Sequence, residues 1–150
     1  MDSEVNTNEI LSDGNKSVLH FPRGLYGFEN HTDFILSESE YKPFMWLQSA
    51  SEKSLSFLTV DPFLFFPDYE LDVDDESIKD IGVKDASDVL VISIVTLSSK
   101  DNYTHITANL QGPLIINKNN KKGMQIVLPD PRWSTKHDLL QKNDSRSRTC

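Results

Sequence analysis

Short runs of β-branched and aromatic residues recur along the chain, separated by glycine, proline, aspartate and asparagine. Runs of this kind are typical of β-strands, and the residues that bound them are typical of turns. The longest run, 89–97, is apolar on both faces, which indicates a central strand or a strand covered on both sides. The runs that predict strands are 5–11, 18–21, 34–36, 44–48, 55–60, 89–97, 103–110, 113–117 and 124–128.

Strands of this length and spacing favour an all-β, mainly antiparallel fold, either a small closed or nearly closed β-barrel or a sandwich. One short helix is expected near 75–81, because Asp74 or Asp75 can cap it and Gly82 can end it. We expect residues 1–137 to form this single domain. Residues 138–150 are polar and basic, and we expect them to form a flexible C-terminal tail.

Composition adds limits to this picture. The chain has 150 residues, the length of one domain, and 37% of them are hydrophobic, which indicates a modest core. No apolar run approaches the ~18 residues of a membrane span, and the N-terminus lacks the pattern of a secretory signal. Cys150 is the only cysteine, so no internal disulfide or multi-cysteine metal site is possible. These features predict a cytoplasmic protein with no membrane partner.

The charge is distributed unevenly. The formal net charge is −8, and residues 61–88 contain ten acidic residues and two lysines, so this segment accounts for the whole imbalance. A net negative protein is repelled by phosphate backbones, which argues against direct binding of nucleic acid. The segment instead suits a basic protein surface, whose approach it would accelerate. The alternative interpretation is a solvated loop that only aids solubility.

An aromatic run, Phe63-Leu64-Phe65-Phe66, stands between Pro62 and Pro67 at the start of the acidic segment. Packing in the core is one interpretation of this run. The other is an anchor for a partner, because many protein interfaces surround a central aromatic residue with a polar or charged rim. We expect Trp133 to fill a place in the core.

Motifs for catalysis and for phosphate binding, such as G-x-S-x-G and the glycine-rich loops, do not occur in the sequence. The segment 72–76 has the acidic start of a calcium loop, but Ser77 stands where that loop needs glycine. Scattered carboxylates such as Glu29 and Asp61 do not have the spacing of an enzyme site. We therefore expect no catalytic residue, no metal site and no cofactor. The histidines, which also lack metal-ligand spacing, are His20, His31, His105 and His137.

Several blocks of the sequence, in order, resemble the flagellar assembly factor FliW family. They are 21–29 (FPRGLYGFE), 46–49 (WLQS), 57–62 (FLTVDP), Tyr69, 107–117 (TANLQGPLIIN) and 123–128 (GMQIVL). The resemblance covers about residues 3–137 and departs from the family at Trp133, where tyrosine is frequent, and at Lys121 or Lys122, where arginine is frequent. These departures leave the expected fold unchanged.

The signature residues have structural explanations. Gly24 and Gly27 suit a turn that needs unrestricted backbone angles, and Pro22 should end a strand. The side chains of Asn109 and Asn117 should hydrogen-bond to nearby backbone. The residues that we assign to the scaffold are Phe21, Pro22, Gly24, Gly27, Phe28, Asp61, Pro62, Asn109, Pro113 and Asn117.

The resemblance implies a function that composition does not show. Members of the FliW family are non-enzymatic regulators of flagellum assembly that bind flagellin and the RNA-binding translational repressor CsrA. When flagellin is secreted, the freed protein captures CsrA and lifts repression of flagellin synthesis. By this resemblance the protein has two partners, flagellin and CsrA, and it is a monomer when free.

The acidic segment and the aromatic run provide the candidate surface for CsrA, which as an RNA-binding protein is expected to be basic. The competing function is a small-ligand or nucleic-acid-binding β-barrel, since five-stranded barrels often bind oligonucleotides. The acidic charge and the lack of basic residues among the aromatic ones argue against it. The residues that we expect to contact a partner are Phe65, Phe66, Tyr69, Asp72, Asp74, Asp75 and Glu76.

Overall fold

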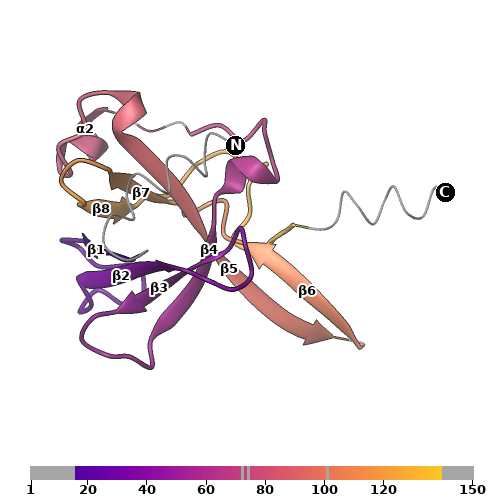
Figure 1. Cartoon of the computed structure of the whole chain (residues 1–150). Helices are drawn as coiled ribbons and strands as arrows, with labels where there is room; N and C mark the ends of the chain where they lie inside the picture. The colour runs from indigo at the N-terminus through magenta and orange to yellow at the C-terminus, as the bar shows by residue number, and fades with distance from the viewer. Residues whose placement is uncertain (1–15, 72, 74, 101, 140–150) are drawn as a thin grey trace.

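Antiparallel strands build most of the chain, which confirms the all-β fold class (Figure 1). The computed structural model describes residues 16–71, 73, 75–100 and 102–139, so the strand expected over 5–11 lies outside the described residues. The strands are β1 (Lys16–His20), β2 (Asp33–Glu38), β3 (Met45–Ser49), β4 (Ser56–Val60), β5 (Val89–Lys100), β6 (Tyr103–Ala108), β7 (Leu114–Asn117), β8 (Gly123–Gln125) and β9 (His137–Asp138).

The strands form a barrel that is nearly closed. Strands β1 to β5 pair in sequence order, β5 also pairs with β7, and β7 pairs with β8. The turn after β7 then returns to β1, where the N–H of His20 donates to the carbonyl of Lys121 at 2.9 Å. A single parallel bridge, between His20 and Lys122, joins the two ends of the sheet. The barrel is therefore not sealed by a full ladder.

Strand β5 is the central strand, as its apolar run predicts, and it extends further than that run. Its first part, Val89 to Ile92, pairs with β7, and its second part pairs with β4 and β6. Beyond its last pair with β4 at Val95, β5 continues with β6 as a two-stranded projection (Figure 1). We call this projection, residues 96–100 and 102–106, the arm.

Two hydrophobic clusters stabilise the domain. The first combines side chains from β1, β2, β3, β5 and β7 with Phe21 and Leu25 from the segment after β1, and the rings of Phe21 and Phe34 meet edge to face at 5.7 Å. The second lies on the other side of β5 and β7, and includes Leu110 and Trp133, which confirms Trp133 as a core residue. Since successive strand residues point to opposite faces, the apolar character of β5 and β7 follows from packing on both sides.

The helix α2 (Asp75–Lys79) lies where the sequence predicts it, and Gly82 ends it with a φ of 74°. Asn117 anchors the turn that follows α2, because its Nδ2 donates to the carbonyl of Ile81 at 2.8 Å. This bond confirms the backbone role expected for Asn117. The 3-10 turns η1 (Pro62–Leu64) and η2 (Ala86–Asp88) flank the helix in the sequence.

The folded domain extends past residue 137, which corrects the expected boundary. His137 and Asp138 form β9, which pairs with β6. Leu139 is buried in the second cluster, and its N–H donates to the carbonyl of Ile106 at 3.0 Å. Two polar residues make no hydrophobic pattern, so no local signal predicts this strand. The rest of the expected tail, 140–150, lies outside the described residues.

Candidate protein-interaction surfaces

The signature segment 21–29 forms a tight loop after β1. β1 ends at His20, two residues before Pro22, and the N–H of Gly24 donates to the carbonyl of Phe21 at 2.8 Å. Gly24 and Gly27 have φ values of 66° and 87°, which favour glycine. A Cβ at Gly24 would lie 2.7 Å from the Cα of Glu29, so the chain passes too close for any side chain there. The loop conformation thus depends on this glycine.

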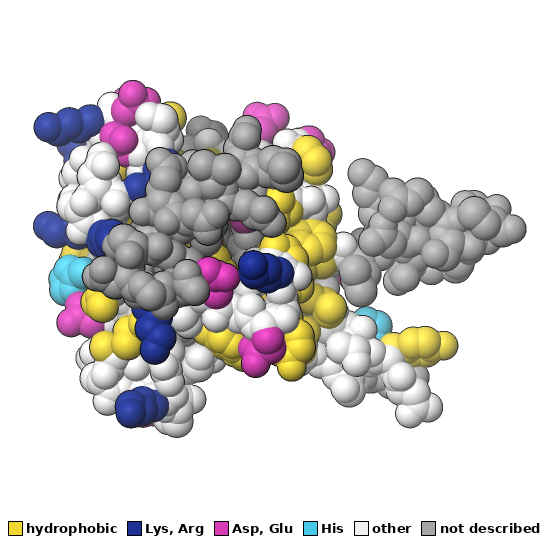
Figure 2. All heavy atoms as spheres, viewed as in Figure 1, with side chains coloured by type: hydrophobic (Ala, Val, Ile, Leu, Met, Phe, Trp, Pro, Cys, Tyr) yellow, Lys and Arg dark blue, Asp and Glu magenta, His cyan; other side chains and the backbone are white. Residues whose placement is uncertain are grey.

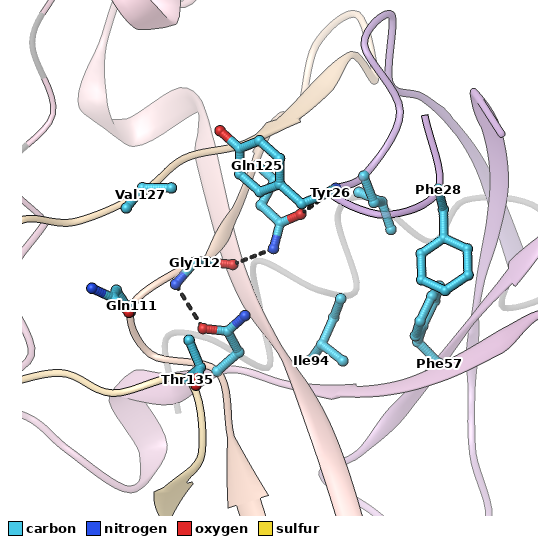
Figure 3. Close-up of a pocket in the computed structure, with 11 residues that line it drawn as sticks. Tyr26, Phe28, Phe57, Ile94, Gln111, Gly112, Gln125, Val127 and Thr135 are labelled. Carbon is cyan, nitrogen blue, oxygen red and sulfur yellow. Dashed lines mark hydrogen bonds between the residues drawn. The ribbon is translucent and has the colours of Figure 1, made fainter. Parts of the chain in front are cut away.

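A chain of hydrogen bonds joins the signature loop to two distant blocks (Figure 3). The N–H of Tyr26 donates to Oε1 of Gln125 at 2.9 Å, and Nε2 of Gln125 donates to the carbonyl of Gly112 at 2.9 Å. The N–H of Gly112 in turn donates to Oδ1 of Asn109 at 2.8 Å, which confirms the backbone role expected for Asn109. Residues 99 positions apart in the sequence, Tyr26 and Gln125, therefore meet at one place.

These residues surround an open hollow of about 270 Å³, which we call the signature hollow (Figure 3). None of its lining residues is charged, although 25% of the chain is. Tyr26 and Val127 are each 59% exposed at its edge, and the ring of Phe28 lies 5.3 Å from that of Phe57. The lining residues are Leu25, Tyr26, Phe28, Phe57, Ile94, Asn109, Gln111, Gly112, Gln125, Val127 and Thr135.

The hollow was not among the sites predicted from the sequence. Gly27, Phe28 and Asn109 were assigned to the scaffold, and Phe28 and Asn109 line the hollow as well. Aromatic residues are enriched and charged residues depleted at the centre of protein interfaces, as they are in this hollow. In the sequence, the family resemblance is the available signal for this site. It identifies the blocks of similar sequence but does not predict that they lie side by side in the folded protein.

The aromatic run divides between the surface and the core. Phe63 and Leu64 are each 38% exposed, whereas Phe65 and Phe66 are half-buried against the second cluster. The ring of Phe66 lies 4.9 Å from that of His137. Asp61 and Pro62, which precede the run, are buried, and Oδ1 of Asp61 accepts the N–H of Phe63 at 2.8 Å. Phe65 and Phe66 thus pack against the core, and Phe63 and Leu64 are the half of the run that a partner could reach.

Tyr69 lies in the core, contrary to its expected place on a partner-facing surface. It is only 3% exposed, and its hydroxyl donates to the backbone carbonyl of Leu110. Its ring packs edge to face on Trp133 at 4.8 Å. Burial raises the pKa of the Tyr69 hydroxyl well above its usual value. We therefore leave Tyr69 out of the proposed surfaces.

Several carboxylates of the acidic segment serve the fold. Asp85 caps η2, where its Oδ1 accepts the N–H of Ser87 at 3.2 Å. Asp80 forms an ion pair of 2.6 Å with Arg23, which ties the signature loop to the turn after α2. Both side chains of this pair are at least half exposed, so its stabilising contribution is at most about 1 kcal/mol.

The acidic side chains of α2 are exposed. Acidic side chains occur at several places on the face of the molecule in Figure 2. Asp75 and Glu76 stand in its first turn, and Glu76 forms a 3.5 Å ion pair with Lys79. Asp75 also lines an open hollow of about 590 Å³ together with Phe63 and Ile78. The structure thus brings an exposed aromatic residue next to the acidic helix. Asp72 and Asp74, also predicted to contact a partner, lie outside the described residues.

The described residues contain no group of three or more metal-ligating side chains. The pKa of His137 lies below its usual value because burial disfavours the charged ring, and the charge of Asp138 opposes this shift. No helix in the described ranges has the length and apolar character that a membrane crossing requires.

Comparison with known proteins identifies the family. A family model described as FliW protein matches residues 4–139. The chain belongs to the FliW family. A FliW member from Treponema denticola, named flagellar assembly factor FliW, is 47% identical over 133 residues, which cover 89% of each chain. The member of that name from Treponema pallidum is 44% identical over 129 residues, covering 86% of this chain and 85% of its own.

The fold agrees with that of a FliW protein of known structure. A crystal structure of the flagellar assembly factor FliW superposes with a TM-score of 0.75 at 34% identity. The match covers 85% of this chain and 87% of that chain. Both the sequence resemblance and the fold class predicted from the sequence are therefore confirmed.

Proposed function

We propose that this protein is a non-enzymatic, cytoplasmic flagellar assembly factor that binds flagellin and, once flagellin is secreted, binds CsrA. Capture of CsrA relieves its repression of flagellin synthesis. The observation that carries the proposal is membership of the FliW family over residues 4–139, with relatives named flagellar assembly factors. When free, the protein is a monomer without a cofactor.

The two candidate surfaces support a protein with two partners. The acidic surface consists of Asp75 and Glu76 on α2 and the exposed half of the aromatic run, Phe63 and Leu64, beside which Phe65 and Phe66 are half-buried. Asp72 and Asp74 belong to it as a prediction from the sequence alone. A basic, RNA-binding partner such as CsrA matches its charge. The signature hollow is uncharged and suits a partner that approaches with apolar and amide groups.

A pull-down from flagellated cells tests the proposal. The tagged protein is expected to recover both flagellin and CsrA. An unrelated tagged protein of equal length and net charge is the control, because it reports capture through charge alone. Recovery of neither partner, or equal recovery by the control, contradicts the proposal.

Direct binding of RNA is the discriminating measurement against the competing function of a nucleic-acid-binding barrel. We expect no gel shift of flagellin-leader RNA by the purified protein, because its net charge of −8 disfavours contact with phosphates. We expect the protein to release the same RNA from CsrA. Tight, salt-sensitive binding of RNA by the protein alone contradicts the proposal.

A further inference from the structure

The arm leaves one edge of β5 without a partner strand in the described residues. Strand β4 pairs with β5 only from Ser93 to Val95, whereas β6 pairs with it as far as Lys100. On the β4 side, the backbone of residues 96–99 is therefore unpaired (Figure 1). An unpaired strand edge is a template for another strand.

The register determines which backbone groups point to this edge. In an antiparallel pair, successive residues alternate between facing the partner strand and facing away from it. The carbonyl of Ile94 accepts the N–H of Asn109, which follows β6, at 2.8 Å. Thr96 and Ser98 continue this alternation and face β6. Leu97 and Ser99 consequently direct their N–H and carbonyl groups to the free edge.

The free edge lacks the features that normally prevent strand addition. Natural edge strands are protected by charged residues, proline or bulges. Residues 96–99 are Thr, Leu, Ser and Ser, and Leu97 is 57% exposed. The outer edge of β6 pairs with β9 at Thr107 and Ala108 and accepts the N–H of Leu139 at Ile106, so it is open within the described residues from Tyr103 to His105. The β5 edge of the arm leads directly to Ile94, which lines the signature hollow.

The edge is continuous with the signature hollow, and both are uncharged. Ile94 and Thr96 are two residues apart in β5 and therefore lie on the same face of the sheet. Phe57 precedes Leu58, the first residue of β4 that pairs with β5, and it lines the hollow together with Ile94. The face of the arm visible in Figure 2 shows hydrophobic, histidine and uncharged polar side chains. A strand added to β5 would therefore direct alternate side chains toward the hollow.

We propose that the free edge of β5, from Thr96 to Ser99, binds an extended, uncharged segment of a partner protein as an added β-strand. Backbone hydrogen bonds to Leu97 and Ser99 supply the pairing, and the hollow receives side chains from one face of the segment. The inference rests on the proposed function and assigns this surface to flagellin, because the acidic surface matches the basic partner.

Amide hydrogen exchange of the wild-type protein, with and without saturating flagellin, tests this directly. The amides of Leu97 and Ser99 are expected to exchange at least ten times more slowly in the complex. The amides of Thr96 and Ser98, already paired with β6, should change little and serve as internal controls. Flagellin binding without protection of Leu97 and Ser99 overturns the inference alone. Failure of flagellin to bind overturns the proposed function as well.

A pair of substitutions at one position separates backbone pairing from side-chain contact. L97P removes an N–H that faces the free edge and leaves the ladder with β6 intact, whereas L97T keeps the N–H. Titration calorimetry should show flagellin bound at least ten times more weakly by L97P, and within threefold of wild type by L97T. Affinity for CsrA should stay within twofold for both, and this retained binding verifies the fold.

Two results overturn the strand-addition model. Equal loss of flagellin binding in L97P and L97T means that the side chain of Leu97, and not the backbone, is recognised. Light scattering that shows a wild-type dimer, abolished in L97P, means that the edge pairs with a second copy of this chain.

Discussion

The acidic surface around α2 and the signature hollow differ in how firmly their side chains are held. α2 has five residues, none of them buried, and its Glu76–Lys79 pair joins two side chains that are each 73% exposed. In the hollow, hydrogen bonds join Tyr26 to Gln125 and Gln125 to Gly112, and the loop that carries Tyr26 is anchored by the buried Leu25. We therefore expect the acidic surface to act on a partner through the electric field of its charges and the hollow to act through its shape.

This difference predicts different effects on binding. Exposed charges mainly raise the rate of association, and their effect is screened by salt. A preformed apolar surface mainly slows dissociation, because little conformational entropy is lost when its side chains become fixed in the complex. We therefore expect the acidic surface to tolerate single substitutions and the hollow not to.

The largest effect is expected from G24A in the signature loop. The φ of 66° and the 2.7 Å approach of a Cβ to Glu29 force the loop to change, at a cost of about 3 kcal/mol or more in the free energy of unfolding. G27A is the matched control: its φ is 87° but its Cβ meets nothing within 4 Å, so it should cost about 1 kcal/mol. Urea denaturation measures both, and equal costs contradict the role given to Gly24.

The second effect is expected from Q125M, which removes the bridge between the loop and Gly112. Loss of both hydrogen bonds should cost about 1–3 kcal/mol of unfolding free energy, and flagellin binding should weaken. Q111M is the control, because Gln111 lines the same hollow outside that chain of hydrogen bonds. Denaturation and calorimetry of the two variants should differ, and similar results would show that the bridge does not maintain the hollow.

A smaller effect is expected when Asp75 and Glu76 are changed together to Asn and Gln. Each exposed charge contributes about 0.2–1 kcal/mol, so affinity for CsrA should fall severalfold and its salt dependence should flatten. Glu40 and Glu52, exposed acids outside the segment, are the control pair with the same change in net charge. Equal effects from both pairs would mean that only the total charge of the protein matters. If neither pair changes CsrA binding, the acidic residues of α2 only aid solubility.

The smallest effect is expected from pH at His137, whose ring packs on Phe66 and Trp133. Because burial lowers its pKa in the folded state, the unfolded state binds the proton more readily. Stability contributed by the neutral ring is present above pH 6.5 and is lost as the pH falls toward the lowered pKa. H137F should therefore lose less stability than wild type between pH 7 and pH 5 in thermal melts. Parallel pH dependence in both proteins contradicts this.

The sequence predicted the strands well, because alternation and bounding turn residues are local signals. Gly82 ends α2, as expected, and β1 ends two residues before Pro22. Strand β9 was missed because His137 and Asp138 have no apolar pattern and gain their place only by pairing with β6. Such pairing depends on the whole fold.

The candidate sites were harder to predict than the strands. Tyr69 stands in an acidic, polar stretch, yet its ring is buried, because Trp133 approaches it from 64 positions further along the chain. The signature hollow likewise requires Gln125 to reach Tyr26 across the barrel. Composition indicated the exposed acids of α2, but no local pattern indicates which distant blocks meet.

Titration of both partners against two variants tests the central claim that two surfaces serve two partners. The variants are L97P and the pair D75N with E76Q, each measured against flagellin and CsrA at two salt concentrations. We predict that L97P loses flagellin and keeps CsrA, while the acidic pair variant weakens CsrA, flattens its salt dependence and keeps flagellin. If both variants weaken the same partner and leave the other unchanged, the claim of two separate surfaces is wrong.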